Sequence, residues 1–310
     1  MEANVYLPNI SNLSNSGDLA YFMAMQEARQ RDTPDRCAQK WDHRAEFWKK
    51  EQVNNRKGEA RVISAMTYLE QKGLLQNHFD VVDIGCGPAR FVSAFARQVH
   101  HVVGLDISRK MVEHGREHIR KEGLTNAQLY ICDFQTLDIE KEGYKGAFDL
   151  VFSSMTPAIH SMDSLMKSIG MSRAWCCHIT HLSGRNHLRE QIMQEVFGRQ
   201  AQRQWTGSWF YSLFNVLFLL GYDPETSYEN SHQEIWVNPD EEYVEFLMEH
   251  MLPPEEITKD NADQIRKWLL AHRNEDGLVQ EITDTSYGRI LWDVRNRTER
   301  PDYHILRQGA

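Results

Sequence analysis

The stretch that decides the fold runs from Val81 to Arg90 and reads VVDIGCGPAR. Its first half is a short apolar run that contains Asp83, and its second half places glycines at positions 85 and 87. Short β-branched runs are typical of buried strands, and a glycine-rich turn before a helix lets a ligand lie against bare backbone. We therefore expect a strand, a tight turn and a helix here, with Asp83, Gly85 and Gly87 at a binding site.

The sequence around this stretch alternates short apolar runs with amphipathic helices. Between the second and third runs, for example, Ser108 is positioned to cap a helix that ends at Gly123. This alternation is typical of βαβ units and predicts an α/β fold, a Rossmann-like doubly wound sheet. The expected strands are FDVVDI (79–84), HVVGLD (101–106), LYIC (129–132), FDLVFSS (148–154) and AWCCHIT (174–180).

Helical patterns also precede and follow these strands in the sequence. We interpret residues 1–56 as an N-terminal helical cap or lid and residues 57–310 as the core, with a helical insertion at about 238–275. Such an insertion would cover the carboxyl edge of the sheet, where α/β proteins bind ligands. A second helix is expected to begin at Thr33, Pro34 and Asp35, with Cys37, Trp41, Ala45 and Trp48 on one face. The remaining expected elements are helices at 18–30, 62–73, 186–197, 208–220, 239–251 and 261–272, and strands at 226–237 and within 278–294.

Composition excludes several classes of protein. The formal net charge is −9, the wrong sign for holding nucleic acid on a broad basic surface. The most apolar stretch, 209–220, is shorter than the ~20 residues that cross a bilayer, and the start of the chain does not resemble a signal peptide. The five cysteines form no CxxC pair, which indicates reduced thiols. We expect a cytoplasmic protein whose partner is a small-molecule substrate; the oligomeric state stays open.

Two further acidic residues end predicted strands. Asp106 follows Asp83 by 23 residues, and a carboxylate at that place can accept both hydroxyl protons of a ribose. Asp133 ends the third predicted strand, beside Phe134. One ligand can therefore touch the ends of three neighbouring strands.

This set resembles class I S-adenosylmethionine-dependent methyltransferases, whose glycine turn reads D/E-x-G-x-G-x-G. DIGCGPA matches that motif except that Ala89 replaces the third glycine, and the similarity covers about residues 40–185. The resemblance implies the cofactor S-adenosylmethionine and the product S-adenosylhomocysteine. It implies that the methionine portion lies against Asp83, Gly85 and Gly87, the ribose on Asp106, the adenine on Ile107, Asp133 and Phe134, and that Ser153 belongs to the same site.

A glycine turn also opens dinucleotide-binding folds. Such a fold needs glycine or alanine where this chain has Arg90, and Asp83 would repel a pyrophosphate. The sequence therefore favours a methyltransferase over a nicotinamide or flavin dehydrogenase. The fourth strand lacks the [DN]PP[YF] motif with which methyltransferases of adenine bases or glutamine amides hold their substrates.

His160 follows the fourth predicted strand, where this fold presents the transferred methyl group. It is our candidate general base, and the competing interpretation is a solvent-facing residue at a helix start. Aromatic residues at helical spacing belong either to the core or to a substrate pocket. The candidates for contact with a hydrophobic or cationic substrate are Trp41, Trp48, Trp209 and Tyr211.

Four cysteine and histidine residues near position 178 are of the types that bind metal ions. Alternate side chains of a strand face opposite sides, so Cys176 and His178 share one face while Cys177 and His181 share the other. Four ligands do not converge from such a strand without a bend, so we expect no metal site, and the role of the cluster stays open.

The sequence predicts methyl transfer to a small-molecule acceptor by in-line displacement. The sulfonium already makes the methyl electrophilic, so the protein mainly has to align the acceptor and exclude water. The alternatives are a methyltransferase of protein or RNA and a non-catalytic S-adenosylmethionine-binding protein. The nature of the acceptor atom, N, O, S or C, stays open.

Overall fold

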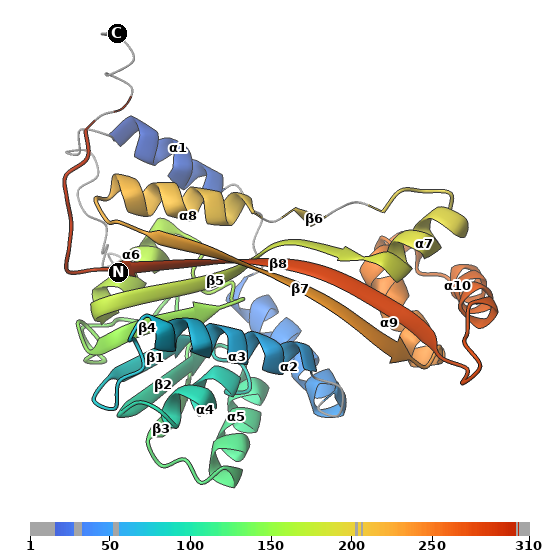
Figure 1. Cartoon of the computed structure of the whole chain (residues 1–310), viewed down its shortest axis with the longest axis horizontal. Helices are drawn as coiled ribbons and strands as arrows, with labels where there is room; N and C mark the ends of the chain where they lie inside the picture. The colour runs from blue at the N-terminus through green and yellow to red at the C-terminus, as the bar shows by residue number, and fades with distance from the viewer. Residues whose placement is uncertain are drawn as a thin grey trace. The chain divides into compact units, whose positions relative to one another are not determined.

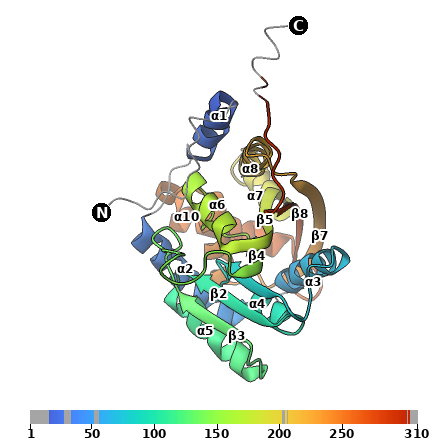
Figure 2. The ribbon, with the colours of Figure 1, turned by 90° about the vertical axis from the view of Figure 1, so that its left-hand side faces the viewer.

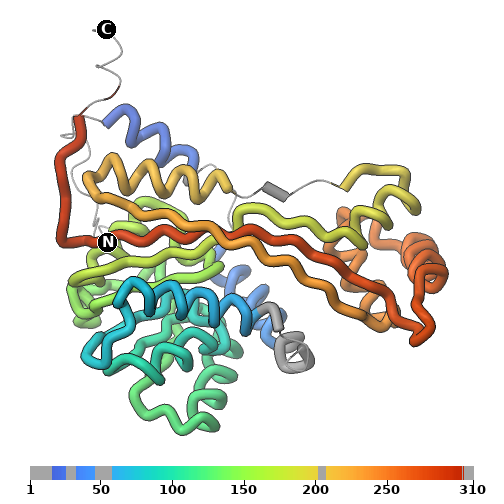
Figure 3. Tube along the Cα trace, in the orientation of Figure 1, coloured from blue at the N-terminus to red at the C-terminus, as the bar shows by residue number. Residues whose placement is uncertain are grey.

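The structure is a computed structural model, and it describes residues 16–27, 33–51, 56–201, 204–205, 207–301 and 303 (Figure 1, where a thin grey trace marks the rest; Figure 3 shows the chain as a tube in the same orientation). Within these residues the helices are α1 (Ser16–Glu27), α2 (Pro34–Glu51), α3 (Arg56–Gln71), α4 (Arg90–Ala96), α5 (Arg109–Lys121), α6 (Met162–Met171), α7 (His187–Glu195), α8 (Ser208–Leu219), α9 (Glu241–Met251), the 3-10 helix η2 (Pro254–Glu256) and α10 (Lys259–Ala271). The strands are β1 (Asp80–Ile84), β2 (His101–Asp106), β3 (Ala127–Ile131), β4 (Phe148–Ser154), β5 (Ser172–Asn186), β6 (Gln204–Trp205), β7 (Glu225–Val237) and β8 (Val279–Asp293).

The strands form one sheet in the order β3-β2-β1-β4-β5-β8-β7, with β6 paired to β5. Strands β1 to β5 pair in parallel, and the chain winds outward from β1 to β3 before it crosses to β4 on the other side. The expected Rossmann-like doubly wound α/β sheet is confirmed. In such a sheet the crevice between the two directions of winding lies at the carboxyl ends of the central strands, which here are β1 and β4.

The expected strands were accurate in the first half of the chain. Strands β2 and β4 have the predicted bounds, whereas β5 continues six residues beyond the predicted end, and its extension pairs with β6 at Ser183 and Gly184. The segment 278–294 forms the single strand β8. Strand β7 was expected at 226–237 and has nearly these bounds, whereas the polar residues 181–186 hid the extension of β5.

Helix α4 holds the two central strands in place. Its apolar side chains are buried, and Phe91 and Phe95 pack on Phe152 of β4 with ring centroids 4.7 and 5.1 Å apart. The neighbouring helix α5 begins as expected, because the Ser108 side chain accepts a hydrogen bond from the Met111 amide. Both helices follow directly on the turns that end β1 and β2, so their starts face the carboxyl edge of the sheet.

The chain divides into two compact units. The first comprises residues 1–180, 208–227 and 289–310, and the second 181–207 and 228–288. In the second unit, α7, α9 and α10 bury a separate core that includes Ile192, Val244 and Ile265. The segment expected as an insertion, 238–275, lies in this unit, and the segment expected as a cap, 1–56, belongs to the first.

In the first unit, α1 lies along α8 (Figures 1 and 2). The Phe22 and Tyr211 rings meet edge to face with centroids 5.5 Å apart, and the Ser212 hydroxyl donates to the Phe22 carbonyl at 3.0 Å. Among the described residues, no helix combines the length and the apolar character that a membrane span requires.

Candidate cofactor and substrate site

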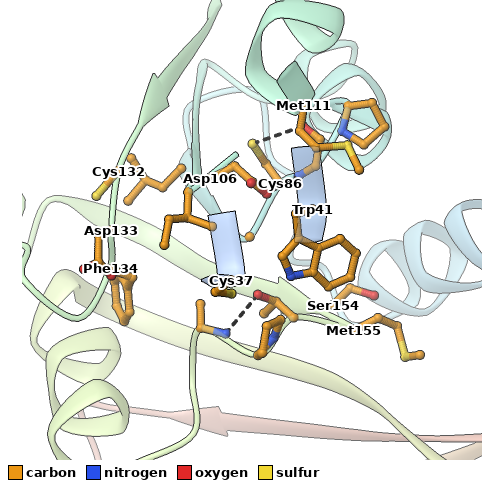
Figure 4. A pocket seen from close by; sticks show the side chains of 18 of the residues that line it. Cys37, Trp41, Cys86, Asp106, Met111, Cys132, Asp133, Phe134, Ser154 and Met155 are labelled. Atoms are coloured by element: carbon orange, nitrogen blue, oxygen red, sulfur yellow. Dashed lines mark hydrogen bonds between the residues drawn. The ribbon is translucent and has the colours of Figure 1, made fainter. Parts of the chain in front are cut away.

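A cavity of about 500 Å³ opens in the first unit at the carboxyl edge of the sheet (Figure 4). Its wall comes from the strand ends and turns at the carboxyl ends of β1 to β4, from α2, from the first two residues of α4 and from single residues of α3 and α5. The lining residues are Pro34, Cys37, Trp41, Arg44, Arg61, Gly85, Cys86, Gly87, Pro88, Arg90, Phe91, Leu105, Asp106, Ile107, Met111, Cys132, Asp133, Phe134, Gln135, Ser154, Met155, Thr156, Pro157, Ala158 and His160.

The glycine turn after β1 has the left-handed backbone that its composition predicts. Gly85 has a φ of +74°, and a Cβ there would lie 2.0 Å from the Thr156 hydroxyl oxygen, so no side chain fits. Gly87 has a φ of +52° with nothing within 4 Å of the place of a Cβ, which leaves its backbone bare. Ala89, which stands where the methyltransferase motif has a third glycine, is also left-handed, with a φ of 67°.

The Asp106 carboxylate stabilises this turn and lines the cavity next to Ile107. One oxygen accepts from the Gly87 amide and the other from the Ser108 amide, both at 2.8 Å. Burial raises the pKa of Asp106 above its usual range. Each carboxylate oxygen has a second lone pair, so Asp106 can accept two further hydrogen bonds from a bound molecule.

Asp83 is nearly fully buried, with 1% of its surface exposed, and is not among the residues that line the cavity. Its Oδ2 atom has no hydrogen-bond partner. The pKa of Asp83 is raised to about 8, chiefly by burial and also by the Asp106 charge, while the Arg61 charge opposes the shift. A buried carboxyl oxygen without a partner is costly, and a cationic or N–H-bearing ligand would compensate it.

Asp133 and Phe134 line the cavity beyond β3. Lys167 of α6 fixes this segment, because its buried ammonium donates to the Phe134 and Gln135 carbonyls at 2.9 Å. Burial lowers the pKa of Lys167. Nothing in the sequence pattern distinguished this lysine, since its partners are backbone atoms more than 30 residues away.

His160 lines the cavity from the loop that follows β4. Its Nδ1 lies 2.6 Å from the Pro157 carbonyl oxygen, which can only accept, so Nδ1 carries a proton and Nε2 is the basic nitrogen of the neutral ring. The same loop contains Met155, whose φ of 55° is unusual for a residue with a side chain. This sharp turn places Ser154, Thr156 and His160 on one cavity wall.

Two residues expected at the site lie in a buried hydrogen-bonded chain instead of lining the cavity. Trp209 donates from its indole to Nε2 of His178 at 3.1 Å, and Nδ1 of His178 lies 2.7 Å from the Ser153 hydroxyl. Burial lowers the pKa of His178 to about 4, so this histidine is neutral near neutral pH. Ser153 and Trp209 are therefore held by hydrogen bonds within the fold and do not line the cavity.

The other three substrate candidates lie in different places, and one of them lines the cavity. Trp41 lines the cavity, with the Arg44 guanidinium 5.3 Å from its ring centroid. Tyr211 is 55% exposed on α8, away from the lining residues. Trp48 falls on α2, but its side chain lies outside the described residues.

The cysteine and histidine cluster is also divided. Burial raises the pKa of the Cys177 thiol to about 12, and it raises that of Cys176 as well, so both are inert thiols. His181 belongs to the second unit. Among the described residues, no three His, Cys, Asp or Glu side chains are close enough to hold a metal ion.

Helix α2 is hydrogen-bonded to the start of α5, which follows Asp106 in the sequence. The Asp42 carboxylate accepts from the Ser108 hydroxyl at 2.5 Å and from the Lys110 amide at 3.1 Å. The Ser108 amide in turn donates to Asp106, so one serine connects the helix that contributes Trp41 to the carboxylate at the end of β2. Sequence reasoning missed Asp42, and it missed Arg44 and Arg61, because these residues lie on helices outside the glycine motif.

Comparisons with known proteins agree with this geometry. Residues 75–195 match the family model described as a methyltransferase domain. With the glycine turn, the acidic strand ends and the strand order above, the match shows that this part of the chain belongs to the class I methyltransferase family.

The curated relatives act on acceptors of different classes. The chain is 34% identical over 71 residues to the 23S rRNA (uracil(1939)-C(5))-methyltransferase RlmD of Alkalilimnicola ehrlichii (23% of this chain, 16% of the relative). It is 32% identical over 85 residues to the 2-heptyl-1-hydroxyquinolin-4(1H)-one methyltransferase of Mycobacteroides abscessus (27% and 35%) and 30% identical over 105 residues to human EEF1A lysine methyltransferase 2 (32% and 44%). The chain thus spans less than half the length of these relatives.

Proposed function

We propose that this protein transfers a methyl group from S-adenosylmethionine to a small-molecule acceptor. The observation that supports it best is the meeting of three features in one cavity: the bare backbone at Gly87 and the carboxylates of Asp106 and Asp133. Asp83, with its buried and unpartnered oxygen, lies near the end of β1, the strand that leads into the glycine turn. The bound cofactor supplies an electrophilic methyl group.

Each part of the cofactor has a suitable residue. Asp106 has lone pairs left for the ribose hydroxyls, and Asp133 can accept from the adenine amino group, with Ile107 and Phe134 as apolar contacts. The ammonium of the methionine portion suits Asp83, because a cation favours the ionised carboxylate that burial disfavours. Ser153 would then support this wall through His178.

The size of the cavity suits a small-molecule cofactor, and the charge of the protein favours a small acceptor over a nucleic acid. About 500 Å³ lies within the ~300–1,000 Å³ of pockets that enclose one small molecule. The net charge of −9 argues against a broad phosphate-binding surface, and the five free cysteines suit a reducing compartment such as the cytoplasm. We propose His160, with Nε2 as its basic nitrogen, as the group that accepts a proton when the acceptor must lose one.

Calorimetric titration with S-adenosylhomocysteine and with NAD tests the proposal. We expect saturable binding of S-adenosylhomocysteine and none of NAD. Asp106→Ala should weaken binding by about a hundredfold, since two hydrogen bonds to a charged acceptor are worth ~3 kcal/mol together. Asp260→Ala, which removes a carboxylate from the first turn of α10, is the matched control and should bind as the parent does.

The same titration reports on Asp83. Because its pKa is about 8, Asp83 is mostly protonated at pH 7, and pairing with an ammonium should release about one proton. The binding enthalpy should then depend on the ionisation enthalpy of the buffer, and Asp83→Asn should remove that dependence. Binding of NAD without binding of S-adenosylhomocysteine would overturn the proposed function, whereas binding without transfer to any acceptor would favour a cofactor-binding protein.

A further inference from the structure

The His160 loop, residues 155–160, follows β4 and is held near both of its ends. Near its start, the Thr156 side chain lies against the glycine turn, because a Cβ on Gly85 would meet the Thr156 hydroxyl oxygen at 2.0 Å. At its end, the backbone amide of His160 donates to the Ser164 hydroxyl of α6 at 3.0 Å. Since His160 is the proposed general base, the position of this loop decides where that base lies.

A third attachment of the His160 loop comes from Gln135, 23 residues before Ala158 in the sequence. The side-chain nitrogen Nε2 of Gln135 donates to the Ala158 carbonyl oxygen at 2.6 Å, and both residues line the cavity. A carbonyl only accepts hydrogen bonds, so the Gln135 amide presents its NH2 group to the loop. The hydrogen bond therefore joins the segment after β3 to the segment after β4 within the cavity wall.

The backbone of Gln135 is itself fixed by its neighbours. Its amide donates to Oδ1 of Asp133 at 3.0 Å. Its carbonyl, like that of Phe134, accepts from the Lys167 ammonium at 2.9 Å. Lys167 is only 3% exposed, so a shift of this backbone would leave a buried ammonium without its acceptors, which is costly. The Gln135 side chain thus extends from a segment that is held in place.

Asp133 connects this segment to the cofactor, a step that rests on the proposed function. Asp133 and Phe134 lie together on one side of the cavity (Figure 4), and in the proposed function the Asp133 carboxylate accepts from the adenine amino group. Each carboxylate oxygen has two lone pairs, so Asp133 can accept from adenine and from the Gln135 amide at the same time. Adenine in this place restrains residues 133–135 further, and the Gln135 side chain extends that restraint to the His160 loop.

We infer that Gln135 is a positioning residue that holds the His160 loop in place when the cofactor is bound. Its hydrogen bond ends on Ala158, and the residue before it, Pro157, supplies the carbonyl that fixes the Nδ1 proton of His160. A loop held at Ala158 keeps that carbonyl and the His160 ring in the arrangement described above. The general base is therefore best ordered in protein that carries a methyl donor.

Amide hydrogen exchange in the His160 loop, measured with and without saturating S-adenosylhomocysteine, tests the inference. In the parent, the ligand should slow this exchange by about fivefold or more, the factor that one hydrogen bond can contribute. Gln135→Met keeps the length of the side chain and removes the donor, so the slowing should fall below about twofold.

Two further variants complete the experiment. Gln135→Glu keeps the shape of the side chain and replaces its donor by an acceptor oxygen, so it should lose the slowing as Gln135→Met does. Gln128→Met removes the same amide from an exposed residue of β3 that does not line the cavity, and should respond to the ligand as the parent does. The affinity of both Gln135 variants for S-adenosylhomocysteine should stay within about threefold of the parent value.

The outcomes are separable. A merely structural role of Gln135 would accelerate exchange in the loop equally with and without the ligand, and a slowing that persists in both Gln135 variants would overturn the inference. The inference is also wrong if bound S-adenosylhomocysteine leaves exchange in the parent loop unchanged, or if both Gln135 variants lose more than about tenfold in affinity, as expected for a residue that binds the cofactor directly. Failure of the unsubstituted protein to bind S-adenosylhomocysteine contradicts the proposed function instead.

Discussion

His160 illustrates how one side chain acquires a defined chemical state from its surroundings. The Pro157 carbonyl lies 2.6 Å from Nδ1, so the proton is held there and Nε2 keeps its lone pair. The residue also lines the cavity, beside the strained turn at Met155. These two features are what a general base requires, namely access to the acceptor and a fixed tautomer.

We predict that His160→Gln lowers turnover by about a hundredfold if the acceptor must lose a proton. An imidazole has to be neutral to accept a proton, so the parent rate should rise with pH, and the variant should lack this rise. The pH profile of the initial rate on the acceptor that the protein methylates measures both effects. His114→Gln on α5 is the control, and overlapping profiles for parent and His160→Gln would show that His160 takes no part in proton transfer.

At the scale of elements, α2 is the helix whose position matters most for the site. It contributes Trp41 and Arg44 to the cavity, and Asp42 attaches it to the start of α5. The connecting residue, Ser108, also caps α5 and donates to Asp106. Cofactor binding and the position of α2 should therefore influence one another, as expected for a helix that closes over a bound ligand.

We predict that Asp42→Ala releases α2 while the sheet stays folded. Amide hydrogen exchange in α2 should accelerate, because two hydrogen bonds to one carboxylate are lost, and the affinity for S-adenosylhomocysteine should fall by about tenfold. Exchange in β1 and β4 should not change. Gln39→Ala, an exposed substitution on the same helix, is the control, and unchanged exchange in α2 of the Asp42 variant would refute the attachment.

At the scale of the whole molecule, two buried ionisable groups act on stability in opposite directions. The pKa of His178 is lowered to about 4, so the unfolded chain binds the extra proton between pH ~6.5 and 4, and stability falls as the pH falls through this window. The pKa of Asp83 is raised to about 8, so the folded protein keeps a proton that the unfolded chain has released above pH ~4. Stability due to Asp83 therefore falls as the pH rises from ~4 to 8.

We predict that the free energy of unfolding declines by about 1 kcal/mol between pH 6.5 and 8, where His178 offsets little of the Asp83 effect. Asp83→Asn should flatten this decline and raise stability at pH 8, at the cost of cofactor binding. His178→Gln removes the opposing contribution, so the stability of this variant should rise as the pH falls from 6.5 to 4, where that of the parent is nearly level. Denaturant titrations followed by tryptophan fluorescence measure all three, and a stability that rises toward pH 8 in the parent would contradict the assignment.

The sequence by itself determined the parallel sheet, the glycine turn and the acidic strand ends. These features depend on local rules: apolar runs form strands, left-handed turns need glycine, and parallel strands bring their carboxyl ends to one edge. Local patterns were therefore sufficient to place Asp106, Ile107, Asp133 and Phe134 at the cavity. They were sufficient for His160 too, since it follows β4 closely.

Only the tertiary structure decided which other residues reach the site. Arg44, Arg61 and Asp42 lie on helices whose approach depends on packing, and Ser153 and Trp209 turn away into a buried chain with His178. Gly115 is another residue that only the packing explains. It lies inside α5, where the helix propensity of glycine is low. A Cβ there would lie 2.6 Å from Leu129 and 2.9 Å from the Ala89 Cβ, a close approach between segments far apart in the sequence. Contacts of this kind depend on how whole elements pack, which local patterns do not specify.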